Sequence, residues 1–579
     1  MPRLKHCLVA ALVLTSCMPL RVLAYGVDFE GPDEAVELLE KYLDLYRWRS
    51  RDIEADELRA LVERTPADAE ALLNTAGYFT PKIAATLSGE AGAERVRVTV
   101  DSGPLAMVRE VALQLEGQIN EDPAYRERVE AYLQRDPALA RGLPFSQSGW
   151  SAYKRRALNA LQFRRYAGAR ITHSEARVVP GEAAVDLSLT LDSGPYYRYG
   201  EIMIEGLLRY PERIVRDQIH LDSGSEFHRR DLQELQSDLQ EMPQFATVIV
   251  EPVLKAEPPY HAPVKVTLQE APMQKFTAGF GYNTNTGFRT ELTHRYNNVA
   301  DRGWVLDSKI RWEQLEQELG ASLTFPRERS GYDHRVYMNV ENSKVSGLDS
   351  STYKAGVARS IKGDKIDRTI TLEYLTERRE VVDGEVERPQ TLSLSYQWIR
   401  RELDSLRNPR DGSVLQLEAG GGIKQVLSDT NFLRLYGRST YYWPMAQKDV
   451  LITRIELGNT LTHDPNAVPT DFLFRAGGSN SVRGYDFESL GIQTGDGVQP
   501  ARALATATLE YQHAIFKDWR AAAFVDYGDA ADRWQDFEGK AGVGVGARWV
   551  SPVGVLGADV AYGIDEQQWR VYFALGVAF

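Results

Sequence analysis

Residues 275–579 alternate between apolar and polar positions over many consecutive segments. In Thr391–Trp398, for example, leucine, tyrosine and tryptophan share one face of an extended chain, while threonine, serine and glutamine share the other. About sixteen such segments follow one another, with aromatic residues near their ends, which is typical of a barrel with lipid outside and polar residues inside. The 305 residues allow about 19 for each strand and its connection (305/16), against roughly 9 to 11 needed to cross lipid. This pattern predicts a 16-stranded antiparallel transmembrane β-barrel, with fourteen or eighteen strands as the alternatives.

Residues 25–274 contain three similar units. Short alternating segments end in Phe29-Glu30-Gly31, Leu115-Glu116-Gly117 and Ile204-Glu205-Gly206, so that the glycines are 86 and 89 residues apart (117−31 and 206−117). In each unit the apolar period changes from two to about 3.6 and back, which predicts a strand, two helices and two strands. The expected elements are 107–115, 122–133, 146–161, 169–179 and 183–191 in the second unit, and 199–205, 211–219, 229–241, 245–254 and 264–270 in the third. We therefore predict three α+β domains of βααββ order, at residues 25–104, 105–195 and 196–274.

A βααββ domain leaves one edge of its sheet open. An open edge presents unpaired backbone groups that can accept a strand from another chain. The three units are therefore expected to recognise other proteins by β-augmentation. The alternative is that the units are spacers, because a neighbouring unit can also cover an edge.

Residues 1–24 have the features of an export signal. Arg3 and Lys5 give a basic start, an apolar run follows, and small residues precede a cleavage position after Ala24. A competing interpretation takes residues 14–17, which end in Cys17, as a lipoprotein cleavage box. Cys7 and Cys17 are the two cysteines of the chain, so the mature protein is expected to lack disulfides and cysteine-ligated metals.

Charge excludes one class of partner. Removing residues 1–24 takes away three basic and no acidic residues, which leaves 65 basic (68−3) against 81 acidic ones, a net charge of −16. This balance disfavours nucleic acid, whose phosphates attract basic surfaces. After residue 24 no run of 18 apolar residues is free of charge, so a spanning helix is not expected and any membrane span should be a closed barrel.

The segment 478–487, between two long alternating strands, places the cation Arg483 among small and polar residues. A guanidinium taken out of water needs carboxylates that match its donor fork. Glu510 and Asp526 are the candidates, because the alternation of their strands turns both toward the barrel interior. We expect the loop to fold into the lumen and Arg483 to contact both acids; the alternative is a solvated arginine and two ordinary pore-lining acids.

Glycines mark two further places in the barrel. Gly542, Gly544 and Gly546 face inward by the same parity, and should clear a track where a second backbone lies close. Glycines also occur in the first and last strands, at Gly279, Gly281 and Gly576, where they should weaken strand pairing and permit a lateral seam for a client strand. Glycines at barrel corners also occur for purely geometric reasons.

Several motifs in the second half of the barrel, taken in order, resemble those of the superfamily of outer-membrane assembly and two-partner-secretion barrels that carry periplasmic POTRA domains. The resemblance rests on the turn 408–412, the loop residues Val482, Arg483, Gly484 and Tyr485, the strand motif 524–528, and the hairpin 542–554. The last strand also resembles the C-terminal assembly signal of outer-membrane proteins, with Phe573 and Phe579 on its apolar face. Tyr485 and Val525 depart from the residues that relatives often carry, without affecting the ion pairs.

Three POTRA-like units and this length look most like the TamA family, the outer-membrane component of the translocation and assembly module. The resemblance implies a protein of the cell outer membrane, with its POTRA domains in the periplasm, that helps to fold and insert outer-membrane proteins, autotransporters among them. It also implies a long inner-membrane-anchored partner, TamB, and contact with outer-membrane lipid. By the same resemblance Arg483 is the loop arginine, and Glu510 and Asp526 are its acceptors.

Other classes of function fit less well. An enzyme would need a clustered nucleophile and base, but the nine histidines are scattered without zinc-type spacing, so no catalytic activity, metal or cofactor is expected. A passive porin does not explain three periplasmic modules or an inward loop. A two-partner-secretion pore is the closest alternative, although such relatives usually carry two POTRA domains and a plugging helix.

Overall fold

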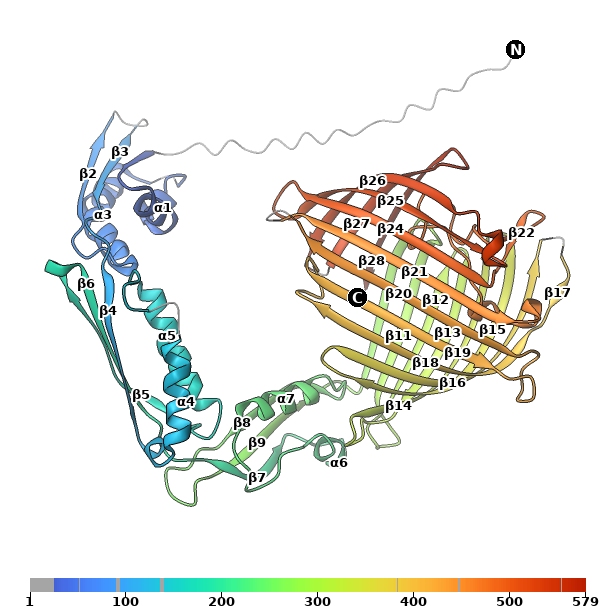
Figure 1. The fold of residues 1–579 in the computed structure, drawn as a ribbon, viewed down its shortest axis with the longest axis horizontal. Coiled ribbons are helices and arrows are strands. Elements are labelled where there is room, and N and C mark those ends of the chain that lie inside the picture. The colour runs from blue at the N-terminus through green and yellow to red at the C-terminus, as the bar shows by residue number, and fades with distance from the viewer. Residues whose placement is uncertain are drawn as a thin grey trace, which may run out of the picture. The chain divides into compact units, whose positions relative to one another are not determined.

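The protein is described here by a computed structural model (Figure 1), which describes residues 25–51, 53–89, 94–135, 140–382, 384–445, 448–552 and 554–578. The predicted export signal, residues 1–24, lies outside the described residues. The chain divides into two compact units, one with the first two N-terminal modules and the other with the barrel, and the third module contributes residues to both.

The second module has the predicted βααββ order, and the first differs from it by one additional helix of four residues, Asp44–Arg47. In each, a three-stranded sheet has the last strand in the centre, parallel to the first strand and antiparallel to the second. The elements of the first module are β1 (Gly26–Glu30), α1 (Asp33–Tyr42), α2 (Asp44–Arg47), α3 (Ala55–Ala76), β2 (Lys82–Ser88) and β3 (Arg95–Asp101). Those of the second are β4 (Met107–Glu116), η1 (Gln118–Glu121), α4 (Pro123–Gln134), α5 (Gln147–Gln162), β5 (Arg170–Val179), η3 (Pro180–Glu182) and β6 (Ala184–Asp192).

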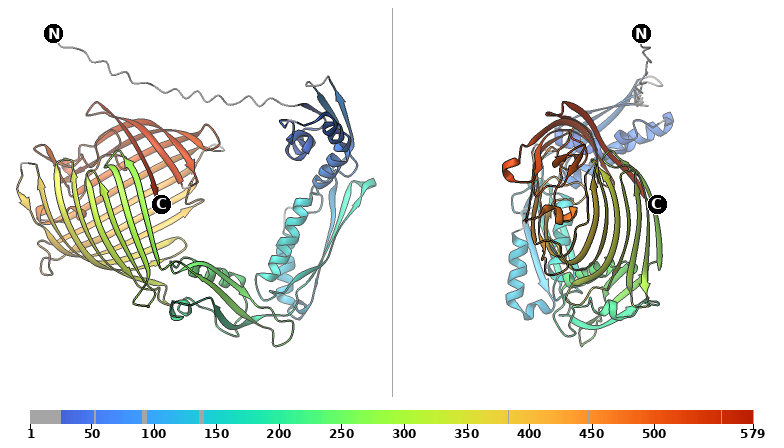
Figure 2. Two further views of the ribbon diagram at one scale, coloured as in Figure 1. Left: turned by 180° about the vertical axis from the view of Figure 1, so that it is seen from behind. Right: turned by 90° about the vertical axis from the view of Figure 1, so that its right-hand side faces the viewer.

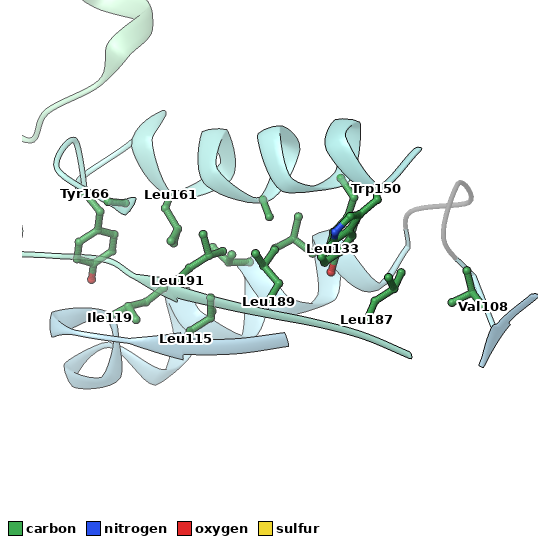
Figure 3. Close-up of a cluster of buried hydrophobic side chains, with 14 of the residues drawn as sticks. Val108, Leu115, Ile119, Leu133, Trp150, Leu161, Tyr166, Leu187, Leu189 and Leu191 are labelled. Carbon is green, nitrogen blue, oxygen red and sulfur yellow. The ribbon is translucent and has the colours of Figure 1, made fainter. Parts of the chain in front are cut away.

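The core of the second module lies between its helices and its sheet (Figure 3). Leu187, Leu189 and Leu191 of β6 are buried against Trp150 and Leu161 of α5. Helix α5 begins where the Ser146 side chain accepts a hydrogen bond from the Gly149 N–H, a typical N-cap. The period-two face of the strand and the 3.6-period face of the helix therefore meet as the sequence predicted.

The third module keeps the same sheet order, and its first helix has only four residues. It consists of β7 (Arg198–Glu205), α6 (Arg213–Arg216), α7 (Arg229–Gln240), β8 (Phe245–Pro252) and β9 (His261–Glu270), with the order β7-β9-β8. The helix expected over residues 211–219 is wrong in length, because only the four residues of α6 are helical. Among the helices of the described residues, none is both long and apolar enough to cross a membrane.

Sixteen antiparallel strands close into a barrel, which confirms the predicted fold class (Figures 1 and 2). The strands are β10 (Gln274–Asn283), β11 (Gly287–Val299), β12 (Trp304–Glu313), β13 (Glu316–Thr324), β14 (Tyr332–Val345), β15 (Leu348–Lys362), β16 (Ile366–Val381), β18 (Gln390–Leu403), β19 (Gly412–Gly422), β20 (Phe432–Pro444), β21 (Val450–Thr462), β24 (Ala503–Ala514), β25 (Trp519–Ala531), β26 (Lys540–Ser551), β27 (Gly554–Gly563) and β28 (Gln568–Ala578). A two-residue strand, β17 (Val386–Glu387), pairs with β16.

The predicted parity of the strands holds in the structure. On β18 the outward Leu394 is 59% exposed and the neighbouring Ser393 is buried. On β25 Val525 and Tyr527 are exposed, whereas Asp526 between them is fully buried. Apolar side chains therefore cover the outside of the barrel, as a lipid-facing wall requires.

Candidate functional site

The connection between β21 and β24, residues 463–502, is called here the luminal loop. It contains two single-turn helices, η4 (Pro465–Ala467) and η5 (Thr470–Phe472), and a small hairpin of β22 (Ile492–Thr494) and β23 (Gly497–Gln499). Its apolar residues Val482, Tyr485 and Leu490 are buried with Leu504 of β24 and Ala530 of β25. The loop is therefore packed against the inner wall of the barrel.

Arg483 of the luminal loop lies within an ion-pair network. Its Nε and Nη2 donate to the two oxygens of Asp526 at 2.7 and 3.0 Å, and its backbone N–H donates to the same carboxylate at 3.1 Å. Its Nη1 donates to Glu510 at 2.8 Å and to Asp559 at 3.1 Å. The guanidinium carbon also lies 3.3 Å from the centre of the Phe524 ring, a cation–π contact. The structure thus brings Arg483 to both sequence-predicted acids and adds a third.

A second arginine completes the network. Arg548 donates from Nε and Nη2 to the two oxygens of Glu510 at 3.0 and 2.8 Å, and from Nη1 to Asp559 at 2.5 Å. Two guanidinium groups therefore face three carboxylates, and every member is buried or nearly so. A buried charge network of this kind is stable only while each charge keeps its partners.

The backbone of the loop approaches the wall at two glycines. A Cβ on Gly542 would lie 1.8 Å from the carbonyl oxygen of Arg483, and a Cβ on Gly563 would lie 2.4 Å from that of Gly484. Gly484 has φ +102°, a conformation that favours glycine. Close approach of the two backbones thus requires glycine on both sides.

The rest of the predicted glycine track has another role. A Cβ on Gly544 would meet the Phe524 ring and the backbone of β27, and one on Gly546 would meet Asp559 and the guanidinium of Arg548. These two glycines make room for the side chains around the ion-pair network instead of for the loop backbone. The second backbone contact is at Gly563, which the sequence reasoning did not single out.

Tyr572 of β28 fixes the loop next to Arg483. Its hydroxyl accepts from the Gly484 N–H at 2.9 Å and donates to the Tyr485 carbonyl at 2.7 Å. The Tyr485 hydroxyl in turn donates to Asp565 at 2.7 Å. The loop is therefore hydrogen-bonded to the last strand and to the turn that precedes it.

A second attachment holds the beginning of the luminal loop to the wall at β16. The Thr470 N–H and hydroxyl donate to Glu377 at 2.8 and 2.6 Å. Arg379 donates to the carbonyl oxygens of Val468 and Asn466, both at 2.9 Å. Glu377 and Arg379 are buried. The β16 attachment, as we call this set of contacts, was not predicted from the sequence.

The first and last strands close the barrel over a short register. Residues Gly279–Asn283 of β10 pair with 574–578 of β28, five pairs in all, whereas β10 and β11 form ten. Gly281 lies opposite Gly576. Phe573 stacks on Tyr282 at 5.3 Å. Phe579, the other residue of the predicted C-terminal signal, lies outside the described residues.

A family model described as the Omp85 superfamily domain matches residues 269–579, more than half of the chain. The chain belongs to the Omp85 superfamily. Two curated relatives of this Omp85 protein are outer membrane protein assembly factors named BamA. The one from Nitratidesulfovibrio vulgaris is 24% identical over 445 residues, which make up 72% of this chain and 55% of the relative. The one from Neorickettsia risticii is 22% identical over 432 residues, which make up 68% and 57%.

The chain thus spans about half the length of the curated relatives it matches. Among solved structures, the crystal structure of BamA from Haemophilus ducreyi lacking POTRA domains 1–3 is similar, with a TM-score of 0.65 and 18% identity. The match covers 82% of this chain and all of the other. Family membership and the lipid-facing wall place this Omp85 barrel in the outer membrane, with its POTRA-like modules in the periplasm.

Several residues of the site were not predicted from the sequence, although strand alternation could have identified some of them. The parity that turns Gly542, Gly544 and Gly546 inward also turns Arg548 inward, and the parity of β28 does the same for Tyr572. Asp559 alternates with apolar residues on β27 in the same way. The residues of the β16 attachment lie about 90 positions from their partners in the loop, and no local pattern links the two.

Proposed function

We propose that this chain helps to insert or secrete outer-membrane β-barrel and autotransporter proteins, as a TamA-type member of the Omp85 superfamily. In this proposal the sheet edges of the modules bind client strands by β-augmentation, and the seam between β10 and β28 opens to pair with a client strand. The observation that carries the proposal is the short, glycine-containing register of that seam.

Two features weaken the pairing at the seam. It has half as many residue pairs as β10 has with β11, and fewer ladder hydrogen bonds must break to open it. Glycine also gives a strand no side chain to pack and a larger entropy loss on ordering, and here Gly281 faces Gly576. A strand released from this pairing presents an edge that another strand can join.

The modules supply edges for recognition. In the first module β1 and β2 are the outer strands of the sheet, and in the second they are β4 and β5. Alternate residues of β2 are exposed, and its outer backbone groups have no strand partner in the sheet. We propose that such edges also bind a TamB-like partner anchored in the inner membrane.

A disulfide across the seam tests the proposal. Directly opposed residues of an antiparallel pair have Cα atoms about 4.5 to 5.5 Å apart, a separation that a disulfide spans. The test variant is Gly281→Cys with Gly576→Cys, and the matched control is Gly281→Cys with Arg289→Cys, which joins β10 to β11 at another directly opposed pair. Both cysteines of the natural chain lie in residues 1–24.

We expect the seam disulfide to block surface display of an autotransporter client, and a reductant to restore display. The control disulfide should leave display unchanged, because β10 and β11 need not separate. Normal display with a fully oxidised seam would refute lateral opening. A large, steady conductance in planar bilayers, together with normal display, would instead favour a passive channel.

A further inference from the structure

The second module contains a long stretch of sequence without acidic residues. From Pro137 to Ser174 the chain has no aspartate or glutamate but seven basic residues, although acids outnumber bases over the whole protein by 81 to 68. Helix α5 lies inside this stretch. A local excess of positive charge on an acidic protein favours an anionic partner.

Four arginines of the second module line a groove between α4 and α5, which run side by side (Figures 1 and 2). On α4 the lining residues follow the spacing i, i+3, i+4 and i+7 from Tyr125 to Tyr132, and on α5 a similar stripe ends at Phe163. Such spacing puts each set on one face of its helix. The groove has a volume of about 730 Å³, and no carboxylate is among its lining residues. The four arginines are Arg128, Arg155, Arg156 and Arg164.

The groove shares Tyr125 and Val129 with the core of the module, but its outer lining lies outside that core. The faces of α4 and α5 that carry Leu133, Trp150 and Leu161 pack on the sheet (Figure 3). Tyr132 and Phe163, by contrast, are 57% and 48% exposed. These two aromatic side chains therefore offer exposed apolar surface on the lining of the groove.

Two of the groove arginines are available for an anion. Arg164 pairs with Glu226, but in the described part of the chain neither Arg128 nor Arg155 lies within ion-pair distance of a carboxylate. Both side chains belong to exposed residues. A planar guanidinium binds a carboxylate through two parallel hydrogen bonds, which a hydrated ammonium does not do.

We propose that the α4–α5 groove binds an acidic segment of another polypeptide, one that combines carboxylates with aromatic or aliphatic side chains. The carboxylates would pair with Arg128 and Arg155, and the apolar side chains would pack on Tyr132 and Phe163. A concave site with arginine forks at its rim suits side chains that enter it. An anionic membrane surface is flat and is contacted by protruding aromatic residues and clustered charges. The groove lies on the helices, so this binding does not depend on strand addition at a sheet edge.

The test uses the full-length chain in nanodiscs of neutral lipid and a short fluorescent peptide that contains glutamate and phenylalanine. We expect measurable binding that weakens as salt rises. Arg128→Glu and Arg155→Glu should each weaken binding about ten-fold or more, because each removes a charge-assisted pair and adds a repulsive charge. Arg155→Lys should cause a smaller loss, since it keeps the charge and removes the fork.

Controls separate the groove from general electrostatics. Arg59→Glu makes the same charge change on α3, at a side chain that is 69% exposed, and should leave binding unchanged. Tyr132→Ser should weaken binding without changing its salt dependence. Equal binding to the arginine variants, or equal binding of a peptide with glutamine in place of glutamate, would overturn the proposal. Co-flotation with phosphatidylglycerol vesicles without peptide binding would overturn it in favour of a lipid surface.

Discussion

Replacing Arg483 by alanine removes the guanidinium at the centre of the luminal ion-pair network. Glu510 and Asp559 keep Arg548 as a partner in such a variant. Asp526 loses both hydrogen bonds that the Arg483 side chain donates to it and retains the one from the backbone N–H of residue 483. The cost of Arg483→Ala therefore falls on a carboxylate that is fully buried.

Breaking a buried ion pair by removing one partner costs about 3 to 5 kcal/mol. At about 1.4 kcal/mol for each factor of ten, the ratio of docked to undocked luminal loop should fall by roughly two to nearly four orders of magnitude. The sixteen-strand ladder contains none of these side-chain contacts, so the barrel should stay folded in the outer membrane. We expect Arg483→Ala to undock the loop and to lower client assembly.

Protease added to intact cells measures the docking, and surface display of an autotransporter measures the activity. Arg295→Ala is the matched control, because Arg295 pairs with Asp307 in a partly exposed ion pair on another part of the wall, and such pairs contribute only about 0 to 1 kcal/mol. A double variant, Arg483→Met with Asp526→Leu, should restore protection, because an apolar pair can replace a buried ionic one. A loop that stays protected in Arg483→Ala, together with normal display, would refute the reasoning.

Three further changes test neighbouring contacts, and a fourth tests an ion pair of the second module. Asp526→Lys should expose the loop to protease as Arg483→Ala does, and Gly542→Val should do the same because its Cβ would lie 1.8 Å from the Arg483 carbonyl oxygen; Val545→Ala on the outward face is the control. Tyr572→Phe removes hydrogen bonds to Gly484 and Tyr485, which should cost about 1 to 3 kcal/mol and give intermediate cleavage. In the periplasmic second module, hydrogen bonds from Arg109 and Arg177 lower the pKa of Asp186 to about 2. This carboxylate therefore adds stability above its unfolded pKa of about 3.9, and the addition is lost as the pH falls toward 2. Hydrogen exchange of β6 should accordingly show Arg109→Ala to be less stable than the natural protein at neutral pH, with a difference that shrinks as the pH falls toward 2.

Strand periodicity was enough to predict the architecture. Each barrel strand has one face in lipid and one in the lumen. Apolar and polar residues therefore alternate along every strand, and the alternating segments can be counted. The same parity turned Glu510 and Asp526 inward, and a guanidinium taken out of water requires carboxylates, which these two residues supply to Arg483. These inferences succeeded because each uses a local rule about which side of a strand a residue occupies.

The parts that were missed depend on distance in space. Parity says that Gly546 faces inward, but not that Asp559 and Arg548 occupy the space next to it. Likewise, nothing near Glu377 in the sequence indicates that Thr470 will donate to it. Strand order and barrel diameter decide which inward residues meet, and neither is a property of a single strand.

The two attachments of the luminal loop have a mechanical consequence. One end is bonded to β16, and the segment around Arg483 is bonded to β24, β25, β27 and β28. The segment between them therefore links β16 to β28 through the lumen. Any outward movement of β28 pulls on this segment, because its other end is bonded to β16. Opening of the seam should therefore stretch the luminal loop at the same time. Distance labels on β16 and β28 would record this coupled movement.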